Sequence, residues 1–331
     1  MDKVDIIIVG AGPIGLTCGI EAERRGLTHL IFDKGCIVNS IFHFPINMTF
    51  FSTSERLEIG NIPFVSHGER PTRREALEYY RRVVQAWGLN VRTYEQVTDL
   101  HPQKGRGFRV DTPRGHYIAR RIIISTGFYD IPNLLNVPGE ELPKVRHYYD
   151  EPHPYVYRSL AVIGGANSAV QVALETYRAG ARVTMIVRES ELGASVKYWL
   201  RPDIENRISE GSITVYFNSI VREIHPDSLV IATPEGLVTL PNDFVFAMTG
   251  YRPDFEFLRR IGVEITPPPD SRPVHDPDTL ESNVRDLFLA GVVCGGVNTS
   301  RWFIENARDH ADRIFDTIAA RQVPHQEGST G

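Results

Sequence analysis

Three glycines near the start of the chain have a spacing that suits the binding of a pyrophosphate group. Gly10, Gly12 and Gly15 form the pattern G-x-G-x-x-G, in which the first permits a tight turn, the second lets the backbone approach phosphate, and the third lets a helix pack closely on a strand. Asp33 lies 18 residues beyond Gly15, where a carboxylate accepts a hydrogen bond from an adenosine ribose hydroxyl. We therefore predict a dinucleotide site whose contacts are Gly10, Gly12, Pro13, Ile14, Gly15, Asp33 and Lys34.

A second turn of this kind, Gly164-Gly-Ala-Asn-Ser-Ala169, lies near the middle of the chain. It has the pattern G-x-A-x-x-A, in which Ala166 leaves the phosphate slightly less room and Gly165 offsets the loss. The strand after it ends at Arg188, and an arginine pairs bidentately with a ribose 2′-phosphate, whereas an acid suits an unmodified ribose. The alternative is that Arg188 is only a solvated surface cation. We predict NADPH rather than NADH here, bound by Gly164, Gly165, Ala166, Asn167, Ser168, Ala169, Arg188 and Lys197.

Both turns stand between a strand and a helix, which is the context that gives such a motif its meaning. The first unit has the predicted strand Val4–Val9, helix Leu16–Arg25 and strand His29–Phe32. The second unit has Leu160–Ile163, Ala169–Ala179 and Val183–Val187 in the same order. The sequence therefore predicts an α/β fold with two Rossmann-like dinucleotide-binding domains.

The remaining segments indicate how the two domains are connected. We predict a helix at Glu75–Trp87, an antiparallel excursion of short strands, a parallel strand at Ile122–Ser125, and a proline-rich linker over Ile131–Tyr155. The excursion consists of Val91–Leu100, Phe108–Thr112 and His116–Ile118. Later elements are the strands Asp243–Met248 and Leu287–Gly291 and the helix Thr299–Ala319. The second domain, 129–250, is thus inserted within a first domain made of 1–128 and 251–331.

The composition excludes several classes of protein. The 331 residues carry a formal net charge of −5 and are 42% hydrophobic, which disfavours nucleic-acid binders and disordered chains. No apolar run approaches the length of a membrane span, and the first residues have no features of a secretion signal. We expect a cytoplasmic protein with no nucleic-acid or membrane partner. Its three cysteines form neither a C-x-x-C pair nor a metal cluster, so we expect no metal site.

The arrangement of the two units resembles the thioredoxin reductases, and the chain is more closely similar to the bacillithiol-disulfide reductase (YpdA-like) family. The second unit is inserted between Thr126-Gly127 and Thr249-Gly250-Tyr251-Arg-Pro-Asp254. The closer resemblance lies in Phe44-Pro45, Thr49-Phe-Phe-Ser-Thr53, Ile59-Gly60, Val145–Tyr155 with His153-Pro-Tyr155, Gly164–Ala169, Phe246–Asp254, Ala290-Gly-Val292 and Phe303-Ile-Glu-Asn306. It implies FAD at the N-terminal site, NADPH at the inserted one, and a homodimer.

The segment Phe44–Thr53, rich in aromatic and hydroxyl side chains, is where we expect the flavin ring. Plain core packing is the alternative for Phe50 and Phe51. The predicted further cofactor contacts are Phe44, Thr49, Phe50, Phe51, Ser52, Thr126, Gly127, Gly250, Tyr251, Gly291 and Val292.

Two departures from these families bear on the chemistry. The redox C-x-x-C of the thioredoxin reductases is missing, so thioredoxin is not the expected substrate. The bacillithiol family carries in its first turn a cysteine, proposed to form a mixed disulfide, where this chain has Ile14. Cys294 follows the Ala290-Gly291 strand end, which in this fold approaches the flavin, and Gly295-Gly296 would leave its thiol accessible. Cys294 is therefore the candidate catalytic residue, whereas Cys18 is expected to pack within its helix.

Three functions follow from the resemblance. The first is an NADPH-dependent FAD oxidoreductase that passes electrons to a low-molecular-weight disulfide such as bacillithiol disulfide. The second is an electron transferase that reduces a small redox protein, ferredoxin or flavodoxin. Its acidic carrier would dock on an arginine group formed by Arg70, Arg73, Arg74, Arg81 and Arg82. The third is a flavin-binding redox sensor without a catalytic role.

Overall fold

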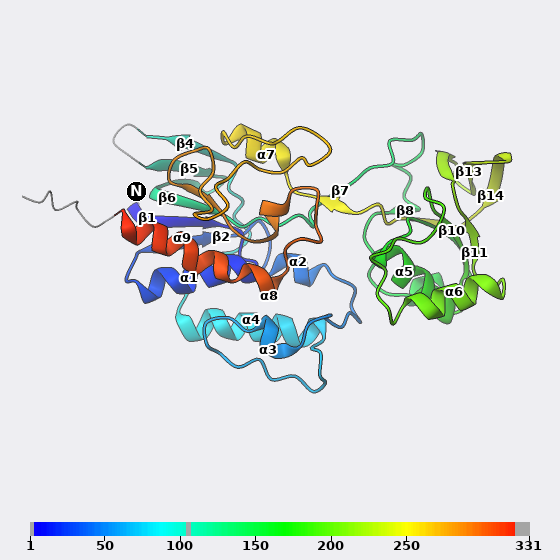
Figure 1. The fold of residues 1–331 in the computed structure, drawn as a ribbon, viewed down its shortest axis with the longest axis horizontal. Coiled ribbons are helices and arrows are strands. Elements are labelled where there is room, and N and C mark those ends of the chain that lie inside the picture. Colours follow the sequence, from blue (N-terminus) through cyan, green and yellow to red (C-terminus); the bar gives the residue numbers. More distant parts are fainter. Residues whose placement is uncertain (1–2, 104–106, 322–331) are drawn as a thin grey trace, which may run out of the picture. The chain divides into compact units, whose positions relative to one another are not determined.

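The computed structural model describes residues 3–103 and 107–321. The chain divides into two compact units, 1–131 with 251–331 and 132–250 (Figure 1). The two segments that connect them, β7 (Ile131–Pro132) and β16 (Tyr251–Arg252), pair as a two-stranded sheet.

The first unit is built on a seven-stranded sheet with the order β3-β2-β1-β6-β5-β4, in which β17 also pairs with β6. The neighbouring strands β3, β2, β1 and β6 pair in parallel, and β17 also pairs in parallel with β6. Strand β5 pairs antiparallel with β6, and β4 pairs antiparallel with β5. The bounds are β1 (Lys3–Val9), β2 (His29–Phe32), β3 (Val91–Arg92), β4 (Asp99–Pro102), β5 (Phe108–Thr112), β6 (Gly115–Ile124) and β17 (Leu287–Leu289).

Strand β6 corrects the sequence prediction of separate strands at His116–Ile118 and Ile122–Ser125. It is continuous, and its first half pairs with β5 while its second half pairs with β17. Most of its first seven residues are exposed or half-buried, whereas its last three, Ile122–Ile124, are all buried, so the pattern of apolar residues changes within one strand. The predicted strand Val91–Leu100 is likewise wrong, because β3 and β4 are separate strands joined by a loop.

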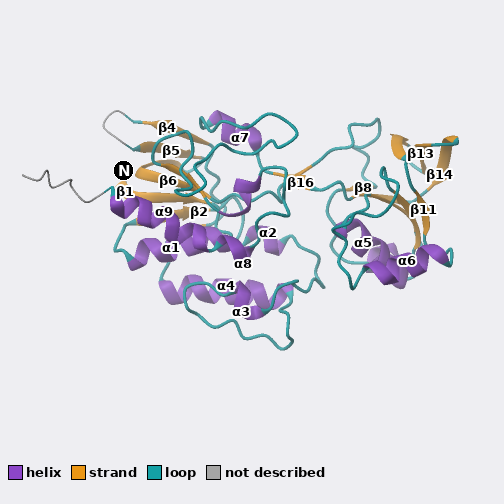
Figure 2. Ribbon diagram, viewed as in Figure 1, coloured by secondary structure: helices purple, strands orange, loops and turns teal. Residues whose placement is uncertain are grey.

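Helices cover the sheet of the first unit (Figure 2). Helix α1 (Pro13–Arg24) contacts β1, β2 and β6, and both α9 (Asp309–Ala320) and α4 (Arg73–Trp87) pack against α1. A capping box between Thr72 and Glu75 starts α4, and Gly88 ends it in the left-handed conformation. Shorter helices are α2 (Asn39–Phe42), α3 (Ser54–Leu57), α7 (Phe255–Arg260), α8 (Ile304–Ala307) and the 3₁₀ helix η2 (Gly291–Gly295). The single helix predicted at Thr299–Ala319 is therefore two helices.

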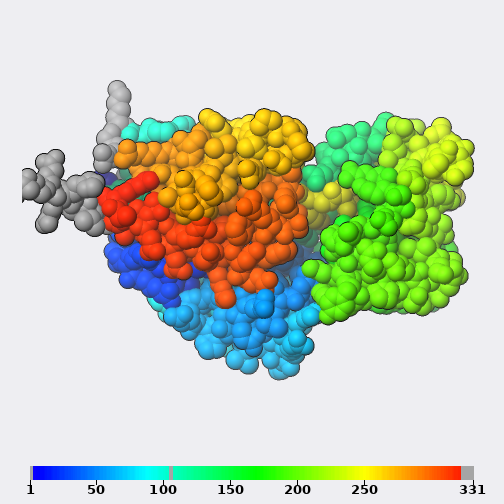
Figure 3. Space-filling view, viewed as in Figure 1, coloured from blue at the N-terminus to red at the C-terminus, as the bar shows by residue number. Residues whose placement is uncertain are grey.

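In the space-filling view of Figure 3, the orange and red C-terminal segment forms much of the visible face of the first unit. This segment contains β17, η2, α8 and α9. In the described part of the chain, no helix combines the length and the hydrophobicity needed to span a bilayer.

The second unit has a parallel sheet with the order β11-β10-β9-β15-β8 and a separate antiparallel sheet, β12-β13-β14. The bounds are β8 (Val145–Arg146), β9 (Ser159–Ile163), β10 (Arg182–Ile186), β11 (Thr214–Tyr216), β12 (Ile220–Ile224), β13 (Ser228–Thr233), β14 (Gly236–Pro241) and β15 (Phe244–Ala247), with helices η1 (His153–Tyr155), α5 (Asn167–Arg178) and α6 (Arg201–Ser209). The predicted linker Ile131–Tyr155 is wrong in its second half. It supplies the edge strand β8, and Tyr149 is buried in the core of this unit.

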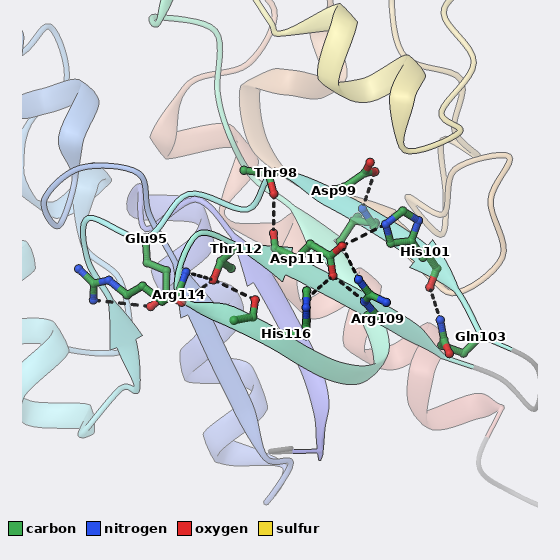
Figure 4. Close-up of polar contacts among 12 residues, drawn as sticks. Glu95, Thr98, Asp99, His101, Gln103, Arg109, Asp111, Thr112, Arg114 and His116 are labelled. Atoms are coloured by element: carbon green, nitrogen blue, oxygen red, sulfur yellow. Dashed lines mark hydrogen bonds and ion pairs between the residues drawn. The ribbon is translucent and has the colours of Figure 1, made fainter.

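The antiparallel strands β4, β5 and β6 of the first unit are connected by a charged cluster around Asp111 on β5 (Figure 4). The Asp111 carboxylate accepts hydrogen bonds from Nε and Nη2 of Arg109, at 2.8 and 3.0 Å. His116 Nδ1 lies 2.8 Å and His101 Nε2 lies 3.2 Å from its oxygens. The guanidinium of Arg109, aided by His116, lowers the pKa of Asp111 to about 2. One carboxylate thus connects side chains from β4, β5 and β6.

We expect Asp111→Asn to lower the melting temperature by about 2 °C at pH 7, since the cluster is partly solvated and such pairs contribute about 1 kcal/mol or less. The folded pKa lies below the usual Asp value of about 3.9, so the stabilisation is complete above about pH 4 and lost as the pH falls towards 2. Thermal unfolding from pH 2.5 to 8 measures this. Asp99→Asn on β4 is the matched control, and a difference between wild type and Asp111→Asn that grows on acidification would contradict the assignment.

Candidate functional site

The first glycine turn connects β1 to α1, and two of its glycines are required by the turn itself. Gly10 has a φ of +110°, and a Cβ there would lie 2.5 Å from the carbonyl oxygen of Ser125. A Cβ on Gly15 would lie 1.9 Å from the carbonyl oxygen of Gly10. By contrast, apart from the chain neighbours of Gly12, no atom of the described residues lies within 4 Å of a Cβ built there. The turn therefore has no room for a side chain at Gly10 or Gly15, whereas the space beside Gly12 is open.

The start of α1 offers hydrogen-bond donors at this open position. Its N-cap residue is Gly12, which has no side chain to accept from the first-turn N–H groups, and Pro13 follows at the first helical position. Such a start carries a partial positive charge and favours an anion. The geometry fits a pyrophosphate group.

Asp33 links the end of β2 to the glycine turn. Its Oδ2 accepts from the backbone N–H of Ala11 and its Oδ1 from that of Gly35, both at 2.8 Å. Burial raises the pKa of Asp33, and these two N–H groups oppose the rise. Lys34, the next residue, forms an ion pair of 3.0 Å with Asp130. Because a carboxylate oxygen can accept more than one hydrogen bond, Asp33 can hold the turn and still accept from a ribose hydroxyl.

The aromatic segment predicted for the flavin divides into buried and exposed parts. Phe50 is buried and belongs to the core, with its ring 6.4 Å from that of Phe44. Phe44 also packs edge-on against Tyr129, at 4.9 Å, and Tyr129 lies 4.5 Å from Tyr251.

The other members of the segment are nearer the surface. Phe51 is 40% exposed, Thr49 is exposed and bridges to Thr72, and Ser52 is half-buried. Core packing therefore describes Phe50 better than it describes Phe51.

Residues from three distant segments meet beside this turn. The Ser125 hydroxyl donates to the carbonyl oxygens of Val9 and Gly10, at 3.1 and 2.9 Å. A Cβ on Gly291, whose φ is +83°, would lie 3.1 Å from Ile14. A Cβ on Gly127 would lie 3.8 Å from Val292. The predicted contacts Ile14, Thr126-Gly127 and Gly291-Val292 are thus brought to one place.

Gly250 and Tyr251 stand where the chain returns to the first unit. Gly250 ends the second unit, and its carbonyl oxygen accepts from the backbone N–H of Asn133. Tyr251 belongs to the first unit, where it contacts Tyr129.

His310 on α9 is a neighbour of this site that sequence reasoning missed. Its Nδ1 accepts from the backbone N–H of Gly291 at 3.1 Å, so the ring proton is on Nε2, which has no hydrogen-bond partner among the described residues. Burial lowers the pKa of His310 to about 4, and the ring is neutral at pH 7. No local signal marks it, because the contact joins residues that are far apart in the chain.

The cysteines do not match the expected reactive thiol. Cys294 lies in η2 and is 1% exposed, because η2 turns its side chain into the core. Burial raises the pKa of Cys294 to about 12. The prediction of an accessible Cys294 thiol is therefore wrong. Cys18 is also buried, with a raised pKa, and packs in the core as expected. Cys36 is half-buried and its pKa is raised as well.

The second glycine turn repeats the first in the other unit, between β9 and α5. Gly164 has a φ of +125°, and its Cβ would lie 2.6 Å from the carbonyl oxygen of Met248. A Cβ on Gly165 would lie 2.8 Å from Val187. Ala166 is the N-cap of α5 and has no polar side chain to cap it, while Ala169 is buried under the turn. The same uncapped helix start is therefore present here.

A loop formed by residues 189–197 covers one side of this turn. Gly193 N–H donates to the carbonyl oxygen of Gly165 at 2.9 Å, and Asn167 Nδ2 donates to that of Ser195 at 2.9 Å. The backbone N–H of Lys197 donates to Asn167 Oδ1 at 3.0 Å. Asn167 is thus used to fasten the loop, whereas Ser168 is exposed on the first turn of α5.

Arg188 lies just past the end of β10, on the surface of the second unit. Its side chain is 80% exposed, and Nε donates to Glu189 at 2.6 Å. The loop places Lys197 beside the glycine turn through its backbone contact with Asn167. Arg188 and Lys197 thus both follow β10 in the chain, and such cations suit the binding of a ribose 2′-phosphate.

Comparison with known proteins agrees with this architecture. Residues 7–291 match the family described as Pyridine nucleotide-disulphide oxidoreductase. Bacilliredoxin reductase Bdr of Bacillus subtilis (strain 168) is 43% identical over 317 residues, which cover 96% of this chain and 98% of that protein. The ferredoxin–NADP reductase of Ignicoccus hospitalis is 25% identical over 299 residues, covering 87% and 89%.

Among solved structures, the bacillithiol disulfide reductase Bdr (YpdA) from Staphylococcus aureus superposes with a TM-score of 0.94 and 38% identity. The superposition covers 98% of this chain and 100% of that one, and it confirms the predicted α/β fold with two Rossmann-like units. The family and these relatives use FAD and NADPH. This chain therefore belongs to the pyridine nucleotide-disulphide oxidoreductases and, within them, to the bacillithiol-disulfide reductase (YpdA-like) family of flavin-dependent enzymes.

Proposed function

We propose that this enzyme transfers electrons from NADPH, through FAD, to a low-molecular-weight disulfide, with bacillithiol disulfide as its first candidate substrate. The observation that carries the proposal is the 43% identity to Bacilliredoxin reductase Bdr along nearly the whole of both chains. The S. aureus relative, which superposes on 98% of this chain, is named for the reduction of bacillithiol disulfide. The cytoplasmic location, the homodimer, and the lack of nucleic-acid and membrane partners remain predictions.

FAD is proposed to bind the first unit. The open side of Gly12 and the uncapped start of α1 fit its pyrophosphate, and Asp33 fits its adenosine ribose. The close approach of Gly291 to Ile14 places the end of β17 next to this turn. His310 holds Gly291 there by accepting from its backbone N–H. When bound, FAD accepts a hydride from the nicotinamide and delivers electrons to the acceptor.

NADPH is proposed to bind the second unit, at the turn Gly164–Ala169. The start of α5 lacks a polar cap, which suits a pyrophosphate. Arg188 and Lys197 are the proposed partners of the ribose 2′-phosphate, and Arg188 exchanges its surface contact with Glu189 for that phosphate.

The chain itself presents no accessible thiolate at the first turn. Ile14 occupies the position of the family cysteine, and it is 7% exposed and packed against Gly291. Cys18 and Cys294 are buried, with raised pKa values that keep them as thiols at pH 7. Disulfide reduction by this enzyme is therefore proposed to proceed without a mixed disulfide to either of them.

The missing family cysteine also favours a second candidate, the reduction of ferredoxin or flavodoxin, because electron transfer to such carriers needs no thiol. The relative from I. hospitalis is named for this activity. Four of the five arginines of this group lie on α4, where Arg74 and Arg81 are exposed, whereas Arg73 donates to backbone carbonyls and Arg82 pairs with Glu78. Only part of the predicted basic surface is therefore available to an acidic carrier.

Steady-state assays separate the candidates. The purified FAD-loaded enzyme is given NADPH and, in separate reactions, bacillithiol disulfide, ferredoxin, flavodoxin or oxygen alone. The proposal expects fast turnover with bacillithiol disulfide only. Turnover confined to ferredoxin or flavodoxin would support the second candidate, and slow reaction with every acceptor would support a redox sensor.

Gly12→Ala tests the FAD site without disturbing the fold. Among the described residues, the added methyl group meets no atom beyond the chain neighbours of Gly12, but it occupies the open side of the turn. We expect the apoprotein to keep its melting temperature within about 1 °C and to bind FAD about tenfold or more weakly, measured by fluorescence titration of the apoprotein.

The control is Gly15→Ala, which brings a Cβ to 1.9 Å from the Gly10 carbonyl oxygen and should destabilise the apoprotein itself. Unchanged FAD affinity in Gly12→Ala would place the cofactor elsewhere.

Arg188→Ala tests the preference for NADPH. We expect the KM for NADPH to rise about tenfold while the KM for NADH stays the same, because only NADPH has the 2′-phosphate. The matched control is Arg182→Ala at the opposite end of β10, which should alter neither constant. Equal rises for both nucleotides would remove the phosphate assignment.

Ile14→Cys tests whether a thiol in the first turn improves disulfide reduction. A cysteine at this helix start is expected to have a lowered pKa, and we expect the rate with bacillithiol disulfide to rise about tenfold while the rate with oxygen is unchanged. Ile14→Ala, which removes similar bulk without adding sulfur, is the control. Equal disulfide rates for both variants would show that the thiol contributes nothing at this position.

A further inference from the structure

A cavity of about 360 Å³ opens in the first unit between two segments, 269–272 and 295–301. The side chains that give it chemical character are Arg272, Arg301, Asn298 and Asp270. None of them belongs to the predicted cofactor contacts. The second segment begins at the end of η2, whose first residue, Gly291, packs on Ile14 of the glycine turn.

The two arginines are available to an anion. Neither Arg272 nor Arg301 forms an ion pair with a carboxylate within the described residues, although Asp270 lines the same cavity. Both are exposed, and the Arg301 guanidinium lies over the Trp302 ring, 5.4 Å from its centroid. Stacking orders a guanidinium while leaving its N–H groups free to donate.

Asn298 adds a neutral donor to the cavity. Its Oδ1 accepts from the backbone N–H and the hydroxyl of Ser300, at 3.3 and 2.9 Å. These contacts orient the side chain through Oδ1 and leave the Nδ2 amide group, on a residue that lines the cavity, available to donate. Two guanidinium groups and one amide are therefore complementary to carboxylate oxygens, and Asp270 is complementary to an ammonium or hydroxyl group.

The cavity is preformed, because its two segments touch through their backbones. A Cβ on Gly296, whose φ is +57°, would lie 2.3 Å from the Ser271 carbonyl oxygen and 2.5 Å from Arg272 Cα. The backbone N–H of Arg272 donates to Thr266 Oγ1 at 3.0 Å. The backbone of Arg272 is thus fixed relative to Gly296, so the site need not be assembled when a ligand arrives.

We propose that this cavity binds the carboxylate groups of the small-molecule disulfide acceptor, with Arg272 and Arg301 as the anion-binding residues and Asp270 accepting from its amino or hydroxyl groups. This rests on the proposed function, which it deepens by specifying an acceptor that carries carboxylates. The same donors would suit a phosphate, and the test separates the two sources.

The test uses the FAD-loaded enzyme and the variants Arg272→Gln, Arg301→Gln and the double variant. Arg285→Gln, another exposed arginine of the first unit, is the matched control. We expect each single variant to raise the KM for bacillithiol disulfide about tenfold with little change in kcat, and the double variant to raise it further. The KM for NADPH, and turnover with the uncharged acceptor hydroxyethyl disulfide, should not change.

Calorimetric titrations provide a readout that does not depend on turnover. Bacillithiol disulfide should bind the wild type and Arg285→Gln, and bind the double variant at least tenfold more weakly. 2′,5′-ADP, for which the second unit is the proposed site, should bind all four variants and the wild type equally, and inorganic phosphate should bind the wild type much more weakly than bacillithiol disulfide does. A phosphate or 2′,5′-ADP affinity that falls in the double variant, with bacillithiol disulfide unaffected, would overturn the proposal in favour of a phosphate site.

The possible outcomes distinguish a failure of the cavity proposal from a failure of the proposed function. If the wild type reduces bacillithiol disulfide and the arginine variants do so with the same KM, the cavity proposal fails and the function stands. If the wild type binds the disulfide through these arginines but does not reduce it, the function fails and the cavity proposal stands. If it neither binds nor reduces the disulfide, both fail.

Discussion

The close approach of α1 to β1 is the constraint on which the first unit depends. The Cα of Gly15 lies so near the carbonyl of Gly10 that no side chain fits between them. This contact holds the start of α1 at the carboxyl end of β1, where its first-turn N–H groups have no side-chain cap. The second unit repeats the arrangement with Gly164 against Met248 and Ala169 beneath the turn. Each unit is thus built around an uncapped helix start that fits an anion, and two such units suit an enzyme with two dinucleotide cofactors.

Short hydrogen-bonded links from distant segments hold the first turn in place. Asp33 reaches it from β2, Ser125 from the end of β6, and His310 from α9 through Gly291. The neutral state of His310 belongs to this role, because only an unprotonated Nδ1 accepts from the Gly291 N–H. The site is therefore a rigid backbone structure that brings few ionisable side chains to the cofactor. This agrees with a reaction in which the cofactors supply the chemistry and the protein supplies position.

The burial of Cys18 and Cys294 argues against a reactive thiolate at either residue. Ile14 fills the space beside Gly291, and Cys18 and Cys294 are core residues whose burial disfavours the thiolate. A cavity elsewhere in the first unit is lined by two arginines, Arg272 and Arg301, together with Asp270. A carboxylate-bearing acceptor would be recognised by charge there, without a covalent link to the enzyme.

Local sequence determined the parts of this protein whose requirements are local. A glycine turn between a strand and a helix is set by steric limits within a few residues, so both turns, their flanking elements and the order of the units followed from the sequence. The other features depend on which distant segments of the chain meet, so only the tertiary structure decided them. Packing against the core made Cys294 inaccessible, and pairing with β5 and β17 made β6 one strand. Pairing with β15 turned part of a proline-rich segment into β8, and the contact of Gly291 with His310 had no signal in the order of residues.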